Sequence, residues 1–309
     1  MMPAVAVHNL LKKYKNGKDT IDAVRGVSFE VEARTIFGII GPDGAGKTSL
    51  FRMLTTLLLP DGGNATVDGS DIVKDYKAIR KKVGYMPGKF SLYQDLTVEE
   101  NLNFFATIFN TTVEENYNLI RDIYVQIEPF KTRKAGKLSG GMKQKLALCC
   151  ALIHKPIVLF LDEPTTGVDA VSRKEFWDML QNLKRQGITI LVSTPYMDEA
   201  SQCTQVALMQ NGKIMTTGTP KEITQNFKQV ILAVKSQNMY QLLQDLSAWN
   251  EVQDVYSYGE YHHAIMKENY NKESLLHYLE SKGNNKIDTH LVSPSIEDCF
   301  MQLMQNKHE

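Results

Sequence analysis

The spacing of hydrophobic positions in the first two thirds of the chain predicts strands, then helices, then strands again. Apolar and polar residues alternate over 4–10 and 24–31, on either side of a polar stretch at 15–19. This alternation predicts two strands joined by a turn. Between about residues 97 and 151 the spacing becomes helical, with apolar residues at 102, 105, 108 and 109 on one face.

Two continuously apolar runs follow, 157–161 and 188–192, and they flank an amphipathic helix predicted over 172–185. Continuous apolar runs are typical of strands that are buried on both faces of a sheet. Strands and helices that alternate in this way predict an α/β fold, with a parallel sheet covered by helices on both sides.

The pattern changes after about residue 225, where short apolar segments predict the order β-α-β-β-α-β of a small ferredoxin-like α+β module. The predicted strands are 229–234, 252–256, 263–266 and 287–292, the helices are 239–246 and 272–279, and a closing helix covers 295–304. A chain of 309 residues has room for two domains. We therefore expect one domain at 4–225 and an accessory module at 226–309.

A glycine-rich stretch follows the apolar run 36–40 and precedes a helix-like segment at 49–54. Residues 41–48 fit the pattern G-x-x-x-x-G-K-[ST], in which backbone N–H groups and the lysine approach the β- and γ-phosphates of a nucleotide and the threonine ligates Mg²⁺. The alternative is a glycine-rich turn without a ligand. The predicted nucleotide-binding residues are Gly41, Pro42, Asp43, Gly44, Ala45, Gly46, Lys47, Thr48 and Ser49.

Two acidic residues, Asp162 and Glu163, stand at the end of the apolar run 157–161. At the carboxyl end of a sheet strand, Asp162 is placed to hold the Mg²⁺ together with Thr48. Glu163 is the candidate catalytic residue, because it could orient or activate the attacking water. The alternative for such a pair is two solvated turn residues.

The helical run that ends at residue 153 opens with Ser139, Gly140 and Gly141. Serine is a good N-cap, and the glycines expose backbone N–H groups at the positive end of a helix dipole, where a γ-phosphate can bind. Standing alone, such a tripeptide would be only a flexible helix start. Its place before the acidic strand makes the combination specific.

Together these motifs resemble the ATP-binding subunits of ABC transporters over residues 4–225. The resemblance implies a cassette fold with a RecA-like mixed sheet, an antiparallel β subdomain and a helical subdomain. It also implies a Walker A motif at 41–48, a Walker B strand ending at Asp162, a signature at 138–141 and a D-loop at 166–169. Tyr14 occupies the place of the aromatic residue that stacks on adenine in that family.

The resemblance also implies partners. Family cassettes pair head to tail, as homodimers or heterodimers, and each ATP lies between the Walker motifs of one chain and the signature of the other. Two cassettes sit on the cytoplasmic face of a membrane permease, so we expect a protein that is peripheral on the inner face of the cell membrane. The segment 294–300 is similar to the C-terminal segment of cassettes in bacterial drug and polysaccharide exporters.

The chain departs from the family pattern at two positions. Family members carry a glutamine after an aromatic-x-Pro segment, where this chain has Gly88, and a histidine after a strand ending in Ser-Thr, where it has Pro195. Glycine and proline supply neither group. Gln94 and His154 fall at the wrong positions to replace them. The interpretation is a subunit that lends its signature to a complete partner cassette, while its own ATP site hydrolyses slowly. The retained acids Asp162 and Glu163 favour the alternative of a self-sufficient homodimeric ATPase.

Composition removes several other classes of protein. Thirty-five basic residues balance thirty-five acidic ones, which disfavours nucleic acid as a partner. The longest apolar runs are far shorter than a membrane span, and the N-terminus lacks a signal-peptide pattern, so we expect a soluble, intracellular chain. The four cysteines match no zinc or disulfide spacing.

Three rival functions would use some of the same residues. A soluble cassette ATPase of the translation-factor or DNA-repair kind would need two cassettes or a coiled-coil insertion, and a P-loop kinase would leave Ser139–Gly141 without a purpose. A non-hydrolysing regulator whose C-terminal module senses a ligand stays open. That module carries one cluster of candidate ligand residues: Tyr256, Tyr258, Tyr261, His262 and His263.

Overall fold

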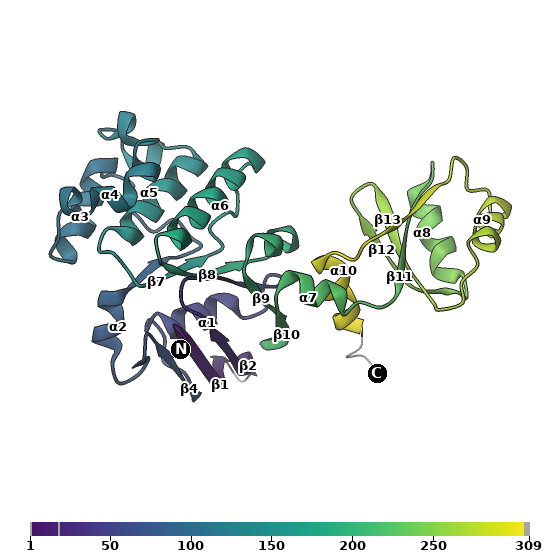
Figure 1. Cartoon of the computed structure of the whole chain (residues 1–309), viewed down its shortest axis with the longest axis horizontal. Coiled ribbons are helices and arrows are strands. Elements are labelled where there is room, and N and C mark those ends of the chain that lie inside the picture. Colours follow the sequence, from purple (N-terminus) through teal and green to yellow (C-terminus); the bar gives the residue numbers. More distant parts are fainter. Residues whose placement is uncertain (1, 18, 306–309) are drawn as a thin grey trace. The chain divides into compact units, whose positions relative to one another are not determined.

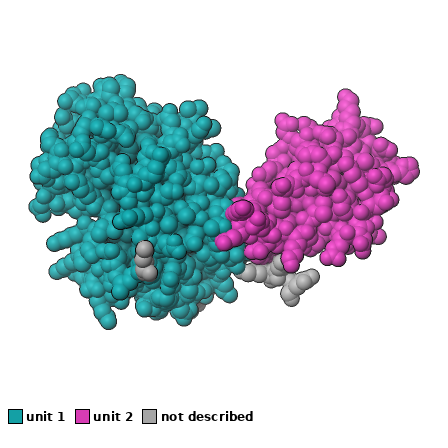
Figure 2. Space-filling model, in the orientation of Figure 1, with its two compact units in different colours: residues 1–220 teal, residues 221–309 magenta. Residues whose placement is uncertain are grey.

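The computed structural model describes residues 2–17 and 19–305, which divide into two compact units (Figure 2). Unit 1 covers residues 1–220 and unit 2 covers residues 221–309. The division falls a few residues before the boundary expected at 225, because helix α7 (Pro220–Gln225) belongs almost wholly to unit 2. That each unit is a separate functional domain stays a prediction.

The centre of unit 1 is a six-stranded mixed sheet (Figure 1). Its order is β10 (Lys213–Gly218), β9 (Gln205–Gln210), β3 (Ile36–Ile40), β8 (Thr189–Thr194), β7 (Val158–Asp162) and β6 (Val83–Met86). All neighbouring pairs are parallel except β9 and β10. Every residue of β3, β7 and β8 is buried, as expected for the continuously apolar runs.

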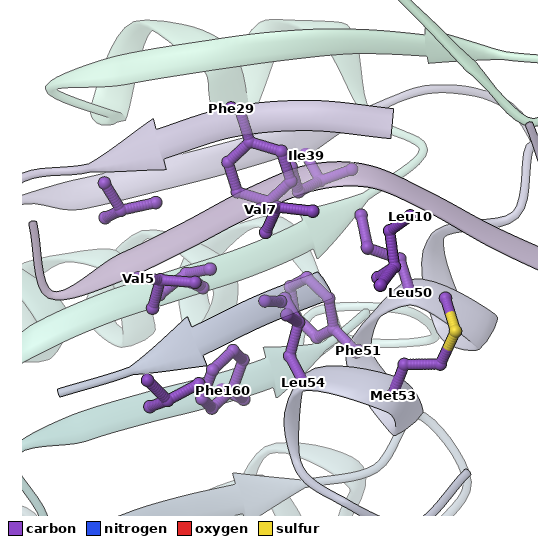
Figure 3. Close-up of a cluster of buried hydrophobic side chains, with 14 of the residues drawn as sticks. Val5, Val7, Leu10, Phe29, Ile39, Leu50, Phe51, Met53, Leu54 and Phe160 are labelled. Atoms are coloured by element: carbon purple, nitrogen blue, oxygen red, sulfur yellow. The ribbon is translucent and has the colours of Figure 1, made fainter. Parts of the chain in front are cut away.

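A second, antiparallel sheet has the order β2 (Asp19–Val31), β1 (Val5–Asn16), β4 (Gly62–Val67) and β5 (Ser70–Asp71). Helix α1 (Lys47–Leu54) shares one apolar core with both sheets (Figure 3). In this core Phe51 of α1 meets Phe160 of β7 edge to face at 5.7 Å, and Phe29 of β2 stacks on Phe37 of β3 at 5.2 Å. This packing fixes the helix that follows the glycine-rich loop.

The helical run predicted over 97–151 divides into separate helices. They are α3 (Val98–Ile108), α4 (Val113–Tyr124), the 3-10 turns η1 (Glu128–Phe130) and η2 (Ala135–Lys137), and α5 (Gly140–Leu152). Capping boxes at Thr97 and Thr112 begin α3 and α4, and Asn110, with φ of 52°, lies in the turn between them. The remaining helices of unit 1 are α2 (Tyr76–Lys82), α6 (Ala170–Arg185) and the 3-10 helix η3 (Met197–Gln202).

Unit 2 has the predicted β-α-β-β-α-β order, followed by a closing helix. Its elements are β11 (Val230–Lys235), α8 (Met239–Ala248), β12 (Val252–Tyr258), β13 (Tyr261–Met266), α9 (Lys272–Ser281), β14 (Asp288–Val292) and α10 (Ile296–Gln305). The sheet is antiparallel with the order β12-β13-β11-β14, which is the ferredoxin-like arrangement. Leucines 242, 246, 275 and 279 of α8 and α9 pack against the sheet in a core of their own. The fold-class prediction is confirmed for both units.

Candidate functional site

The glycine-rich loop 41–46 connects β3 to α1, as the motif requires. Gly41 lies so close to a neighbouring strand that a Cβ there would come within 2.0 Å of the Met209 carbonyl oxygen, and a Cβ on Gly46 would come within 2.2 Å of the Ala23 carbonyl oxygen. Gly44 and Gly46 also have positive φ angles of 78° and 105°. The close approach of the backbone and the left-handed angles explain why glycine occupies these positions.

Lys47 is 3% exposed and folds back over the loop. Its Nζ donates hydrogen bonds to the carbonyl oxygens of Gly41 at 2.7 Å and Pro42 at 3.0 Å, and it lies 3.3 Å from Glu163 Oε1. The lysine predicted to reach the phosphates is therefore held at the mouth of the loop, next to the predicted catalytic acid.

The acid at the end of β7 faces the first turn of α1. Thr48 Oγ1 donates a 3.2 Å hydrogen bond to Asp162 Oδ1, so the two predicted Mg²⁺ ligands are in contact. A hydroxyl beside a carboxylate is a donor set that suits Mg²⁺ together with phosphate oxygens. The predicted metal and phosphate groups thus converge on one point at the carboxyl edge of the six-stranded sheet.

Glu163 has a φ angle of 50°, in the left-handed region that side chains rarely adopt. Its backbone N–H is held at this turn by the carbonyl oxygen of Ser193 at 3.0 Å and by the Ser193 Oγ at 3.1 Å. Such a backbone costs on the order of 1–2 kcal/mol and persists where the surroundings fix it. The sharp turn places the carboxylate beside Lys47 instead of continuing the strand.

The segment 139–141 lies beside the start of α6. Ser139 is the N-cap of α5, and its Oγ accepts the Met142 N–H at 3.3 Å. A Cβ on Gly140 would lie 3.5 Å from the Gly167 carbonyl oxygen, and one on Gly141 would lie 3.0 Å from Ser172 Oγ. The nearest neighbours of these glycines therefore belong to the segment 167–172 and not to the glycine-rich loop. Tyr14, in contrast, joins the loop site, because its Oη lies 3.1 Å from Ser49 Oγ, and the residue is 36% exposed.

Comparisons with known proteins decide which family this site belongs to. The ABC transporter family profile matches residues 24–166. The probable multidrug ABC transporter ATP-binding protein YbhF of Escherichia coli is 41% identical over 308 residues, which are 98% of this chain and 53% of YbhF. The Nod factor export ATP-binding protein I of Burkholderia lata is 36% identical over 66% of this chain and 68% of its own length. The chain belongs to the ABC transporter family.

A solved structure of an ATP-binding subunit of an ABC transporter matches 72% of this chain and 93% of its own, with a TM-score of 0.65 and 25% identity. The loop, acids and sheet of this chain have the arrangement of a P-loop ABC cassette. The chain spans about half the length of YbhF. In the described residues, 2–17 and 19–305, no helix is long and apolar enough to cross a membrane.

The two positions that depart from the ABC pattern both lie at this site. A Cβ on Gly88 would be 3.0 Å from the Asp162 carbonyl oxygen and 3.7 Å from the Glu163 Cβ. Pro195 follows Thr194, whose carbonyl oxygen accepts the Gly41 N–H at 3.2 Å. The missing glutamine and histidine side chains would both have started beside the residues predicted to hold Mg²⁺ and phosphate.

Sequence reasoning missed Ser193 and Glu199. Ser193 Oγ donates to Asp162 Oδ1 at 2.5 Å and also accepts the Glu163 N–H, so it orients both acids. Glu199 is 3% exposed and accepts hydrogen bonds from Thr165 Oγ1 at 2.8 Å and Thr194 Oγ1 at 2.6 Å. It ties the turn after Glu163 to the end of β8. The available signal was that β7 and β8 both end in polar residues, which parallel pairing places side by side.

The aromatic and histidine cluster of unit 2 is hydrogen-bonded to neighbouring residues of the same unit. His263 donates from Nδ1 to Asp298 Oδ1 at 2.6 Å, and the Tyr256 hydroxyl donates to the same carboxylate. His262 is bonded through Nε2 to the Met239 carbonyl oxygen at 2.7 Å. Tyr258 stacks on His263 at 4.3 Å.

His154 has a structural place in unit 1. It stacks on Phe109 at 3.7 Å, and its Nε2 is bonded to the Val83 carbonyl oxygen at 2.9 Å. These contacts explain a histidine in the turn before β7, and they agree with the expectation that it does not replace the family histidine.

Proposed function

We propose that this chain is the Mg-ATP-binding subunit of an ABC exporter, that it pairs with a second cassette, and that its own ATP site hydrolyses slowly. The observation that carries the proposal is the contact of Lys47 and Thr48 with Glu163 and Asp162, beside a position 88 that has no side chain. Phosphate binding and metal ligation need only Lys47, Thr48 and Asp162. Hydrolysis also needs a water molecule held in line, and Gly88 and Pro195 offer no side-chain donor for it.

The division of roles follows from the chemistry of these side chains. Lys47 would neutralise the β- and γ-phosphates, and Thr48 with Asp162 would hold the Mg²⁺ that bridges them. Glu163 would accept a proton from the attacking water, and Ser193 keeps its backbone turned toward the site. Ser139, Gly140 and Gly141 would serve an ATP bound to the partner cassette, because the two glycines contact the segment 167–172, which begins in the D-loop, and not their own glycine-rich loop.

Steady-state ATP hydrolysis and Mg-ATP binding by the purified chain test this proposal. We expect binding with little turnover, and a gain of at least about tenfold in the double variant Gly88→Gln with Pro195→His. The matched control is Gly88→Ala with Pro195→Ala, which makes the same backbone changes without the functional groups. Since a Cβ at position 88 must displace its neighbour by a few tenths of an ångström, the control separates steric disturbance from restored chemistry.

The retained glutamate favours one second candidate, a self-sufficient homodimeric ATPase. Glu163 lies 3.3 Å from Lys47 in a left-handed backbone turn, and this arrangement suits a working general base. High turnover by the chain alone that disappears in Glu163→Gln would favour this candidate over the impaired site. Turnover below detection in the chain alone, restored by mixing with a complete partner cassette and lost again in Ser139→Ala, would favour the lending of the signature.

An apolar groove next to the site supports the pairing with a permease. It has a volume of about 460 Å³ and lies between β6, α3 and α5, with Leu57, Met86, Leu92, Phe105 and Ile108 among its lining residues. An open groove of apolar side chains can accept a short amphipathic helix. Its position after β6 connects it to Gly88, two residues beyond the strand, so a partner seated there would sense the nucleotide site.

Affinity purification of the tagged chain from detergent-solubilised membranes, with identification of retained membrane proteins, tests the permease pairing. Ile108→Glu would place a charge at the groove, where Ile108 is 54% exposed and its replacement leaves the core intact. Val125→Glu is the matched control, because Val125 is 45% exposed and outside the groove. Equal retention of a permease by both variants would contradict the assignment of the groove. Of the two relatives, one is named for Nod factor export, which favours an exporter, and YbhF is named as a probable multidrug ABC transporter protein.

A further inference from the structure

The surface around α2 exposes several large apolar side chains. Leu57 and Leu59, in the loop after α1, are 57% and 65% exposed, and Val73 and Tyr76 are 46% and 40% exposed. These four residues line one cavity of about 260 Å³. Contiguous exposed apolar residues of this kind mark a surface that contacts a protein, a membrane or a ligand. We call these four residues, with the basic residues described next, the α2 surface.

The segment that carries Val73 and Tyr76 is rich in basic residues. Residues 73–82 contain five basic residues and one acidic residue, although the whole chain has equal numbers of each charge. Lys74, Lys77 and Lys81 are exposed, and Lys82 pairs with Asp68 at 2.7 Å. The nearby carboxylates, those of residues 71 and 75, accept backbone N–H groups of residues 71, 73 and 74. The three lysines are thus exposed in the segment that carries Val73 and Tyr76.

Arg80 gives this surface a fixed shape. Its guanidinium donates to the Thr56 Oγ1 at 2.9 Å and to the Thr56 carbonyl oxygen at 2.8 Å, which ties α2 to the loop that carries Leu57. The same guanidinium lies 5.3 Å from the Tyr76 ring centre, and Lys77 Nζ lies 6.0 Å from it. Helix α2 lies at the edge of unit 1 (Figure 1). The apolar and aromatic side chains are thus held together on one outward surface.

We propose that the α2 surface binds the anionic phospholipid surface of the membrane. Apolar and aromatic side chains that enter the headgroup region, with lysines that attract anionic headgroups, form the combination that binds a bilayer surface. A folded protein partner fits less well, because protein interfaces are depleted of lysine and enriched in arginine, and this surface has four lysines and one arginine over residues 73–82. Leu57 and Arg80 also line the groove assigned above to the permease, so the α2 surface and that groove are adjacent. Only the assignment of the groove to a permease rests on the proposed function.

Sedimentation of the full chain with sucrose-loaded vesicles tests the proposal, using phosphatidylglycerol mixed equally with phosphatidylcholine, and phosphatidylcholine alone. We expect binding to the anionic vesicles only, weakened by added salt. Lys77→Gln with Lys81→Gln should reduce the partition coefficient roughly thirtyfold, since each lysine near an anionic surface contributes a factor of roughly five. Leu57→Ser with Leu59→Ser should reduce it without changing the salt dependence. The charge-matched control, Lys174→Gln with Lys213→Gln, alters two exposed lysines elsewhere on unit 1 and should bind like the parent.

Three outcomes would overturn the proposal. The first is no binding of the parent chain to anionic vesicles, and the second is an equal loss of vesicle binding in the α2 and control variants. The third is that the α2 variants keep vesicle binding but no longer retain a permease on affinity purification. The last result would make this surface part of the protein interface. Unchanged Mg-ATP binding in every variant shows that unit 1 is folded. The vesicle assay contains no permease, so its failure leaves the proposed function standing, and failure of the permease capture leaves the lipid result standing.

Discussion

Removing the carboxylate of Asp298 is expected to destabilise unit 2 and to abolish one part of its pH dependence. Asp298 is fully buried, and it joins α10 to the β12-β13 hairpin. One oxygen accepts from His263 and Tyr256, and the other accepts the Ser295 N–H at 2.6 Å and the Ser295 hydroxyl at 2.5 Å. Burial alone would raise the pKa of this carboxyl, but the hydrogen bonds from His263, Ser295 and Tyr256 outweigh burial and lower the pKa from 3.8 to about 2.

The size of the effect follows from that shift. A folded-state pKa of about 2 against 3.8 in the unfolded chain corresponds to about 2 kcal/mol of stability from the ionised carboxylate. Because the unfolded chain binds the proton more readily, this stability is complete above about pH 5 and is lost as the pH falls toward about 2. In Asp298→Asn we expect the free energy of unfolding of unit 2 at about pH 7 to fall by at least about 2 kcal/mol, since the amide also turns a donor toward other donors.

Urea unfolding followed by tryptophan fluorescence can isolate unit 2. The chain has two tryptophans, and Trp249 lies in unit 2, where its ring is 4.5 Å from that of Tyr278. In a Trp177→Phe background the fluorescence therefore reports on unit 2 alone. Glu268→Gln, at an exposed position of the same unit, is the control for loss of one negative charge. The assigned role of this carboxylate would be refuted if Asp298→Asn were as stable as Glu268→Gln. It would also be refuted if the free energy of unfolding of Asp298→Asn fell between about pH 5 and pH 2.5 by as much as that of the parent.

Three further predictions concern unit 1 and the cysteines. Gly41→Ala should destabilise unit 1 by about 3 kcal/mol or more, because its Cβ would overlap the Met209 carbonyl oxygen. Gly44→Ala has open space and a positive φ and should cost about 1–2 kcal/mol. Thermal unfolding compares the two variants, and equal costs would contradict the close approach of the Gly41 backbone to Met209. Asn101→Leu should cost about 3 kcal/mol in urea unfolding, because its fully buried amide bonds the backbone of residues 93–97 four times, while exposed Asn103→Leu should cost little. Burial raises the pKa of all four thiols, that of Cys299 to about 11. A thiol reagent at about pH 8 should therefore react slowly with the native chain and rapidly with all four cysteines in denaturant. A cysteine that reacts rapidly in the native chain would contradict this burial.

The sequence by itself determined the glycine-rich loop between a strand and a helix, the strand that ends in two acids, and the order of elements in unit 2. These features depend on residues close together in the chain: a strand, a turn with glycines at fixed positions, and a helix form through local backbone geometry. The capping boxes at Thr97 and Thr112 are local in the same sense, and they divide a helical run that periodicity alone left continuous. Local patterns also located both departures from the family, Gly88 and Pro195.

Only the tertiary structure decided which distant residues meet. The sheet order β3-β8-β7-β6 places Ser193 against Asp162 and the segment after β6 against the end of β7, and hydrophobic periodicity does not specify strand order. The α2 surface likewise forms because Arg80 joins a helix to the loop that contains Thr56, far from it in the sequence. Apolar spacing tells a strand or helix which face to bury, but the partner that covers that face is chosen by packing of the whole domain.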